Sequence, residues 1–168
     1  FTAAEMQRRQ DAVRGWMAKN SVDACLFTSY HNICYLSDFL YCYFGRRYGL
    51  VVTQTAATSV TAAIDGGQPG RRTFGDNLTY TDWSKENYFS AVKGLVKGVK
   101  RLGIEFDHVN LDFRKQLQDA LPGCEFVDVA APSMRLRMIK SPEEIKHIAK
   151  MTRIADIDRK STRLNSSH

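Results

Sequence analysis

The sequence predicts an α/β protein in which a mixed β-sheet is flanked by helices. Short apolar runs alternate with longer segments whose apolar residues recur at helical spacing, and glycine or proline separates several of them. The chain has 168 residues, of which 43% are hydrophobic and 25% charged. This size and composition allow a buried core without disulfide or metal support. The length suggests one domain, or one domain and a piece of another.

The first half of the chain predicts one helix and three strands. Thr2 and Glu5 have the spacing of a capping box, and apolar residues follow at helical spacing, so a helix should run to about Asn20. Turn residues fill positions 65–70, DGGQPG. Short apolar runs predict strands at 24–28 (ACLFT), 48–53 (YGLVVT) and 59–64 (SVTAAI).

The second half continues the alternation. Its clearest helical pattern extends from Tyr88 to Leu102, and Gly103 is expected to end that helix. The remaining elements predicted are a strand at 103–106 (GIEF), a helix at 113–121 stopped by Pro122-Gly123, and a strand at 125–129 (EFVDV).

A domain boundary is predicted at Ala131-Pro132, where the pattern breaks. The first domain would comprise residues 1–131 and a linker would follow. A new helix is then expected, with Ser141 as N-cap, Pro142 at its first position and Glu144 at its third. Residues 132–157 are thus predicted to be a linker and the first helix of a second, truncated domain.

The last eleven residues, 158–168 (DRKSTRLNSSH), are polar and lack a helical or strand period. They look like the translation of a sequencing-adapter oligonucleotide, and we expect them to be an artefact outside the natural protein. They hold three of the 24 basic residues and one of the 18 acidic ones, so the net charge of +6 falls to +4 without them. The weaker basic balance argues against a nucleic-acid partner.

The four cysteines predict buried free thiols. Cys25, Cys34, Cys42 and Cys124 show no C-x-x-C spacing and lie among apolar neighbours. Free thiols favour a reducing, cytoplasmic compartment. No run is long and apolar enough to span a bilayer, so no membrane association is expected.

The common catalytic motifs are missing from the sequence. It contains no G-x-G-x-x-G, P-loop, H-E-x-x-H or G-x-S-x-G. His31, His108 and His147 have no close ligand spacing, and each is interpreted as a turn or surface residue rather than a metal ligand. No cofactor or metal is predicted.

One segment does suggest chemistry. In Phe39–Val52, FLYCYFGRRYGLVV, Arg46 and Arg47 interrupt two apolar stretches directly after Gly45. A guanidinium in apolar surroundings needs an anionic partner, and its planar fork matches a carboxylate. The residues alone leave two interpretations open, a surface loop or an anion clamp with an aromatic wall.

Several segments resemble the creatinases (creatine amidinohydrolases), within the creatinase, prolidase and aminopeptidase P superfamily. The N-x-x-Y-L-S-x-F portion, 32–39, is shared loosely across the superfamily, whereas Phe-Gly-Arg at 44–46 together with IDGGQP is more specific to creatinases. The resemblance covers nearly all of residues 1–157. It is carried by 27–53 (FTSYHNICYLSDFLYCYFGRRYGLVVT), 64–69 (IDGGQP), 80–83 (YTDW), 127–141 (VDVAAPSMRLRMIKS) and 153–157 (RIADI).

The resemblance implies a fold and an activity. The fold would be the creatinase N-terminal domain, with a ribonuclease H-like layer, followed by the first helix of a missing "pita-bread" catalytic domain. Creatinases hydrolyse creatine to sarcosine and urea without a metal, as homodimers in which the N-terminal domain of one subunit reaches into the other's active site. By residue match, Arg46 would hold the creatine carboxylate and Phe44 would wall the site. The fragment itself would contain no catalytic residue and would be inactive.

This sequence departs from the creatinase pattern at three positions. Arg47 stands where proline is usual, Tyr43 where a small residue is usual, and Gly70 where tryptophan is usual. The substrate is therefore expected to be creatine or a related guanidino or N-methyl carboxylate. The alternatives are the N-terminal domain of a metal-dependent Xaa-Pro peptidase and a stand-alone binding module.

Overall fold

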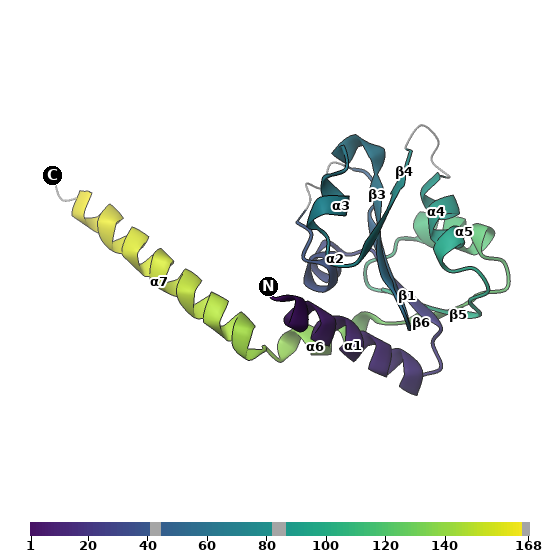
Figure 1. Cartoon of the computed structure of the whole chain (residues 1–168), viewed down its shortest axis with the longest axis horizontal. Helices are drawn as coiled ribbons and strands as arrows, with labels where there is room; N and C mark the ends of the chain where they lie inside the picture. Colours follow the sequence, from purple (N-terminus) through teal and green to yellow (C-terminus); the bar gives the residue numbers. More distant parts are fainter. Residues whose placement is uncertain (41–44, 82–86, 166–168) are drawn as a thin grey trace. The chain divides into compact units, whose positions relative to one another are not determined.

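The structure, a computed structural model, describes the backbone of residues 1–40, 45–81 and 87–165, and side chains as far as Arg159. Helices and strands alternate along most of the chain (Figure 1). The elements are α1 (Ala3–Lys19), β1 (Ala24–Phe27), α2 (Tyr30–Ser37), β2 (Gly49–Thr53), β3 (Ala57–Ala62), η1 (Ala63–Asp65), α3 (Gln68–Arg72), β4 (Asp76–Tyr80), α4 (Asn87–Leu95), β5 (Arg101–Ile104), α5 (Leu111–Ala120), β6 (Glu125–Asp128), α6 (Ala130–Met138) and α7 (Pro142–Asn165).

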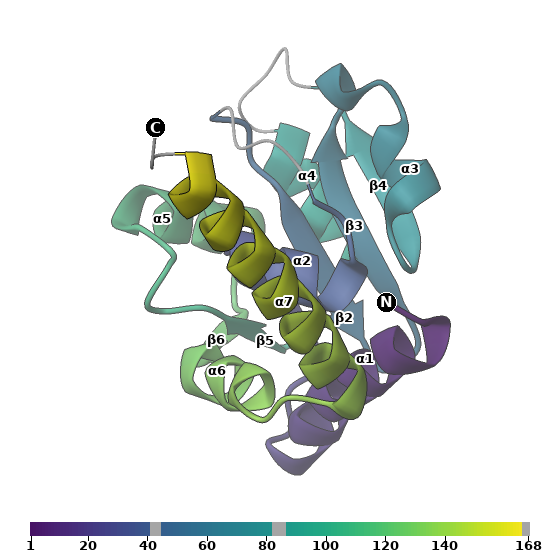
Figure 2. The ribbon, with the colours of Figure 1, turned by 90° about the vertical axis from the view of Figure 1, so that its left-hand side faces the viewer.

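The described strands form one mixed six-stranded sheet, as the sequence predicts. Their order is β4-β3-β2-β1-β5-β6, and β4 and β6 form the two edges (Figure 2). β2 is antiparallel to both of its neighbours, β1 and β3, whereas the β3–β4, β1–β5 and β5–β6 pairs are parallel. The parallel β1–β5 pair requires a long crossover, and the chain between these strands supplies it with β2 to β4 and α4.

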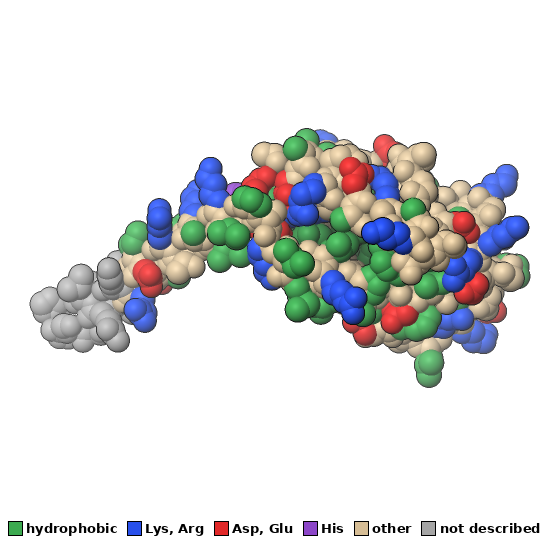
Figure 3. All heavy atoms as spheres, turned by 90° about the horizontal axis from the view of Figure 1, so that it is seen from below, with side chains coloured by type: hydrophobic (Ala, Val, Ile, Leu, Met, Phe, Trp, Pro, Cys, Tyr) green, Lys and Arg blue, Asp and Glu red, His purple; other side chains and the backbone are tan. Residues whose placement is uncertain are grey.

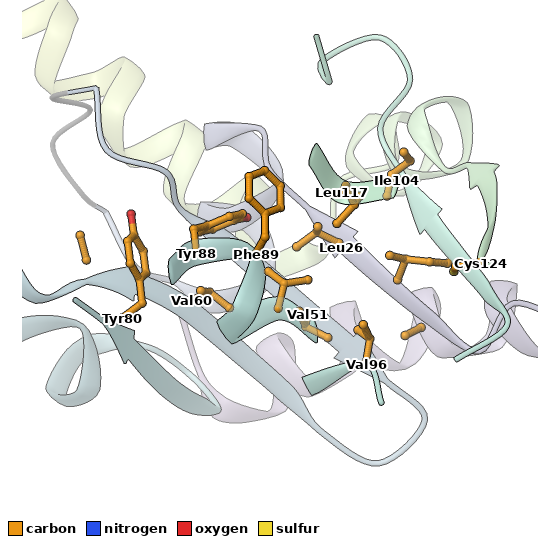
Figure 4. Close-up of a cluster of buried hydrophobic side chains, with 14 residues drawn as sticks. Leu26, Val51, Val60, Tyr80, Tyr88, Phe89, Val96, Ile104, Leu117 and Cys124 are labelled. Atoms are coloured by element: carbon orange, nitrogen blue, oxygen red, sulfur yellow. The ribbon is translucent and has the colours of Figure 1, made fainter. Parts of the chain in front are cut away.

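Helices cover both faces of the sheet. On one face, α1 and α2 bury residues such as Met17 and Ile33 against alternate residues of the central strands. On the other face, α4 and α5 contribute Tyr88, Phe89 and Leu117 to a second cluster (Figure 4). Because both faces are buried, the central strands are continuously apolar rather than alternating, which explains why short runs such as ACLF were recognisable in the sequence.

The predicted long helix at 88–102 is wrong in its second half. α4 ends at Leu95, the chain turns at Gly98 with a positive φ of 81°, and Gly103 lies inside β5. A Cβ on Gly103 would lie 2.6 Å from the Cys25 Sγ on the neighbouring strand. Glycine is therefore needed here for close strand packing, not to end a helix.

Two further segments differ from the prediction. Positions 65–70 do not form a simple turn, since η1 leads into the short helix α3 through Gly66 and Gly67, both with positive φ. The predicted break at Pro132 is helical, because this proline lies in the first turn of α6, where its missing N–H costs no hydrogen bond.

The chain divides into two compact units, residues 1–136 and 137–168, and the division falls within α6. In the second unit, α7 begins with the predicted capping box, since the Glu144 amide donates to Ser141 Oγ at 3.2 Å and the Ser141 amide to Glu144 Oε2 at 2.8 Å. The helix continues to Asn165, so the segment expected to lack periodicity is helical for most of its length.

Exposed apolar side chains recur along α7, and hydrophobic atoms are visible along this helix in Figure 3. They recur every three residues: Ile145, Ile148, Met151, Ile154 and Ile157. In the described part of the chain, no helix has both the length and the apolarity needed to cross a bilayer.

Candidate functional site

The candidate site lies at one end of the central strands, where β1 and β5 end and β2 begins. Pairing of Phe27 with Leu50, and of Leu26 with Ile104, brings these three strand ends together. The segments that follow β1 and β5, around Thr28 and Glu105, therefore meet the segment that precedes β2, around Tyr48. In α/β sheets, ligands bind beyond the carboxyl ends of parallel strands.

A hollow of about 180 Å³ opens at these strand ends. Two arginines and one histidine line it, and no carboxylate does so among the described residues. Such a lining favours an anionic ligand. The lining residues are Thr28, Arg46, Arg47, Tyr48, His108, Val109, Asn110 and Phe113.

Arg47 is held by partners within the chain. Its Nη2 lies 3.4 Å from Asp112 Oδ2, and its Nη1 donates to Gln116 Oε1 at 3.2 Å. Its guanidinium also lies over the Phe89 ring, 4.8 Å from the centroid. These contacts connect the start of β2 to α4 and α5. Arg47 therefore has a structural explanation that needs no ligand.

Arg46 differs from its neighbour because its side chain is exposed at the rim of the same hollow. It directly follows Gly45, whose φ of +78° favours glycine. The structure thus places Arg46, the predicted carboxylate ligand, in a hollow lined by cationic and neutral groups. Phe44, the predicted aromatic wall, lies outside the described residues, as do Tyr43 and Cys42.

The backbone that carries the two arginines is fixed by tyrosines. Tyr80 donates its hydroxyl to the Arg47 carbonyl at 2.8 Å, and Tyr88 donates to the Tyr48 carbonyl at 3.2 Å. Tyr48 in turn donates to Asp65 Oδ2 at 2.9 Å. Burial and this hydrogen bond raise the pKa of Tyr48, while the charge of Arg46 acts in the opposite direction. Tyr48 is therefore a neutral hydrogen-bond donor at neutral pH.

A buried carboxylate lies behind the hollow. Glu105, only 1% exposed, follows β5 and accepts hydrogen bonds from the end of β1 and the start of α2. The amides of Thr28 and Ser29 donate to its Oε2 at 2.6 and 2.8 Å, and Ser29 Oγ and Asn32 Nδ2 donate to its Oε1 at 2.5 and 2.6 Å. These bonds fix the turn that carries Thr28 and satisfy the buried charge.

Thr28 connects this carboxylate to a histidine on the hollow. Its Oγ1 lies 3.4 Å from Glu105 Oε2 and 3.0 Å from His108 Nδ1. His108 was interpreted from the sequence as a turn or surface residue. It is exposed, but it also lines the hollow. The signal available in the sequence was Glu105, a charged residue at the end of an apolar strand.

The remaining predicted residues are not gathered at this site. Cys25 and Cys124 are buried free thiols, as expected, and Cys34 is a half-buried one. Within the described residues, no group of three histidine, cysteine, aspartate or glutamate side chains could hold a metal ion. His147 lies in α7, within ion-pair distance of Glu143 at 3.9 Å.

Comparison with known proteins identifies the family. The sequence matches the family described as the Creatinase/Prolidase N-terminal domain over residues 9–139. The chain belongs to this family. Across 161 residues it is 52% identical to a creatinase of Bacillus sp. (strain B-0618), covering 94% of this chain and 39% of that protein.

Solved structures share the creatinase/prolidase N-terminal fold. The prolidase of Pyrococcus horikoshii superposes with a TM-score of 0.73 at 25% identity, over 89% of this chain and 40% of that one. The creatinase/prolidase N-terminal domain of an X-Pro dipeptidase from Streptococcus pyogenes gives 0.66 at 20% identity, over 76% of this chain and 97% of that one. The chain thus spans about two fifths of the creatinase and of the Pyrococcus prolidase.

Proposed function

We propose that this chain is the N-terminal part of a creatinase-like hydrolase that converts creatine and water to sarcosine and urea. In this reaction the bond between the guanidino carbon and the N-methyl nitrogen breaks. Water supplies the oxygen of urea and the proton taken up by the sarcosine amine. The observation that carries the proposal is the 52% identity to a creatinase, compared with 25% to the Pyrococcus prolidase.

The role proposed for this chain is to bind the substrate carboxylate rather than to perform the hydrolysis. Arg46 lines the hollow together with Arg47 and His108, and its planar guanidinium matches a carboxylate in charge and geometry. Phe44, two residues before it, would form an apolar wall. By itself, the chain should bind creatine weakly and release no urea.

The clamp is proposed to serve a second subunit of a homodimer. An exposed arginine on the N-terminal domain can contact a substrate bound in a catalytic domain only if that domain packs against the surface around the arginine. In this proposal, that catalytic domain belongs to the partner subunit. The exposed apolar side chains along α7, from Ile145 to Ile157, fit a helix that starts this second domain, since exposed apolar side chains favour burial against other elements.

The prolidase likeness supports the runner-up, an N-terminal domain of a metal-dependent Xaa-Pro peptidase. That likeness concerns the fold, which creatinases and prolidases share, whereas the Phe-Gly-Arg segment is more specific to creatinases. Release of proline from an Xaa-Pro dipeptide by the longer protein, dependent on added divalent metal and without urea release from creatine, would favour the peptidase.

The test uses the two arginines as a matched pair in the longer natural protein. Losing one member of a buried charge pair typically costs about 2–5 kcal/mol, so Arg46→Ala should lower kcat/KM for creatine by roughly 30-fold or more. Arg47→Ala should have the smaller effect, because Arg47 already pairs with Asp112 and Gln116. Urea release measures both. The opposite order would reject Arg46 as the clamp.

A further inference from the structure

We infer that residues 46–48 form a rigid support for the Arg46 side chain, and that substrate binding depends on this rigidity. The residues that position the support are Tyr80, Tyr88 and Arg47. The inference rests on the proposed function, because it concerns the carboxylate that Arg46 is proposed to bind. It adds three positioning residues, which act on the substrate through Arg46 rather than by contact.

The backbone of this segment is held by two buried hydroxyl groups. Residues 46–48 lie outside any helix or strand, so no regular hydrogen-bond ladder fixes them. Tyr80, at the end of β4, donates to the Arg47 carbonyl at 2.8 Å, and Tyr88 in α4 donates to the Tyr48 carbonyl at 3.2 Å. The two tyrosines are 8% and 1% exposed, and hydrogen bonds shielded from water are the stronger ones. Two consecutive carbonyls are therefore fixed from two different elements.

A glycine makes room for one of these hydroxyls. Gly49 is the first residue of β2, and a Cβ at this position would clash with the Tyr88 hydroxyl and lie 3.1 Å from Leu26 Cδ1. Its missing side chain lets the hydroxyl approach the Tyr48 carbonyl. The Tyr88 ring also packs edge-on against the Tyr80 ring, with centroids 5.6 Å apart and planes at 80°. Each tyrosine thus helps to hold the other in place.

The Arg47 side chain attaches the segment to two helices. Its Nη1 donates to Gln116 at 3.2 Å and its Nη2 lies 3.4 Å from the Asp112 carboxylate, both in α5. Gln116 Nε2 donates to the same Asp112 oxygen at 2.6 Å, which orients that carboxylate. The guanidinium lies over the Phe89 ring of α4, 4.8 Å from its centroid. Arg47 therefore adds a side-chain attachment to the two backbone ones.

Rigidity of this kind strengthens binding by avoiding a cost. A loop that must become ordered when a ligand binds lowers the affinity by the free energy of that ordering. The contacts that hold 46–48 all lie within the domain, so the segment needs no ligand in order to be fixed. Arg46 is thereby presented at the rim of the hollow from a fixed backbone.

The tyrosines can affect a ligand in the hollow only indirectly. Neither Tyr80 nor Tyr88 is among the described residues that line it, whereas Arg46 is. Removal of the Tyr80 hydroxyl should therefore weaken substrate binding only as long as Arg46 is present. A residue with a merely structural role would weaken the protein in either case.

The test is a double-mutant cycle in the longer protein. Tyr80→Phe keeps the ring and should lower kcat/KM for creatine about three- to tenfold, through KM rather than kcat. Added to Arg46→Ala, it should change the remaining kcat/KM by less than about twofold, because coupled residues are not additive. Tyr35→Phe is the matched control, since its hydroxyl donates to a carbonyl elsewhere, that of Leu136 at 3.2 Å. It should leave KM unchanged with and without Arg46.

A second measurement needs neither a variant nor a substrate. The NMR order parameters of the backbone amides of residues 46–48 in the 168-residue chain should be about 0.8 or higher, as in rigid backbone. They should fall in Tyr80→Phe and stay high in Tyr35→Phe.

The outcomes separate the two proposals. Order parameters below about 0.6 in the wild type would overturn the rigid support, whatever the activity. The support would also be refuted as a determinant of binding if Tyr80→Phe had no effect on KM, or had the same effect with and without Arg46. An unchanged kcat/KM in Arg46→Ala would instead reject the proposed function, and the order parameters would still test the rigidity of the segment.

Discussion

Removing the carboxylate of Glu105 should destabilise the N-terminal domain more than any surface charge change. Glu105→Ala deletes the acceptor of four buried or half-buried donors, from Thr28, Ser29 and Asn32. Each buried donor left unsatisfied costs about 1–3 kcal/mol, although water entering the new cavity recovers part of this. We therefore expect a loss of about 3–5 kcal/mol, a large fraction of the 5–15 kcal/mol typical of a domain.

Glu105→Gln refines the same prediction, because its shape is nearly that of glutamate. In the wild type both carboxylate oxygens of Glu105 accept hydrogen bonds. Glu105→Gln replaces one of these oxygens with an amide NH₂ group, which donates. Oε2 accepts from two backbone amides that cannot reverse, so the new amide must face Ser29 Oγ and Asn32 Nδ2. These side chains can rotate, and a smaller loss of about 1–3 kcal/mol is expected.

Urea unfolding followed by far-UV circular dichroism and by tryptophan fluorescence measures these losses in the 168-residue chain. Glu125→Gln is the matched control, since Glu125 is exposed and pairs with Arg101 at 3.1 Å on the surface. It should change the unfolding free energy by less than about 1 kcal/mol. If Glu105→Ala stays within 1 kcal/mol of the wild type, the network does not fix the end of β1 as described.

Two further predictions concern Cys25. Gly103→Ala should lower the free energy of unfolding in urea by about 1–3 kcal/mol, because the new Cβ would lie 2.6 Å from Cys25 Sγ. Adding Cys25→Ala to the same chain should recover much of this loss. If the effects of the two substitutions simply add, the contact is not the cause. Stability should also fall as pH rises from about 9 towards 12, because burial raises the pKa of the Cys25 thiol to about 12, and that of Tyr48 is raised too. Because folding favours the protonated thiol, the unfolding free energy of Cys25→Ala should fall less steeply with pH than that of the wild type, by up to about 1.4 kcal/mol per pH unit. Parallel plots of unfolding free energy against pH for the two proteins would contradict this.

Much of the fold was predictable because the central strands are buried on both faces. Runs such as ACLF and GLVVT are apolar throughout, and the capping boxes at Thr2 and Ser141 mark helix starts locally. The misplaced end of α4 had a different cause. Val96 and Val99 continue the helical spacing beyond Leu95, although they pack onto the core from a turn, and only the neighbouring strand shows why Gly103 is small.

The candidate site could be predicted only where a single segment carries it. Arg46 could be selected because a guanidinium within an apolar segment needs an explanation. The difference between Arg46 and Arg47 was not visible, since Asp112 and Gln116 lie some 65 residues further along the chain. Thr28, Glu105 and His108 meet only because β1 and β5 are parallel neighbours, a long-range pairing that local patterns do not encode.

The central claim, that Arg46 completes an active site in the other subunit, is tested most directly with mixed dimers of the longer protein. Arg46→Ala chains would be combined with chains that are inactivated by a substitution in the catalytic domain. One of the two sites in such a heterodimer has both an intact Arg46 and an intact catalytic domain. The account predicts that urea release recovers towards half the wild-type rate per dimer, while each parent homodimer stays nearly inactive. No recovery despite confirmed heterodimer formation would show that Arg46 serves its own subunit.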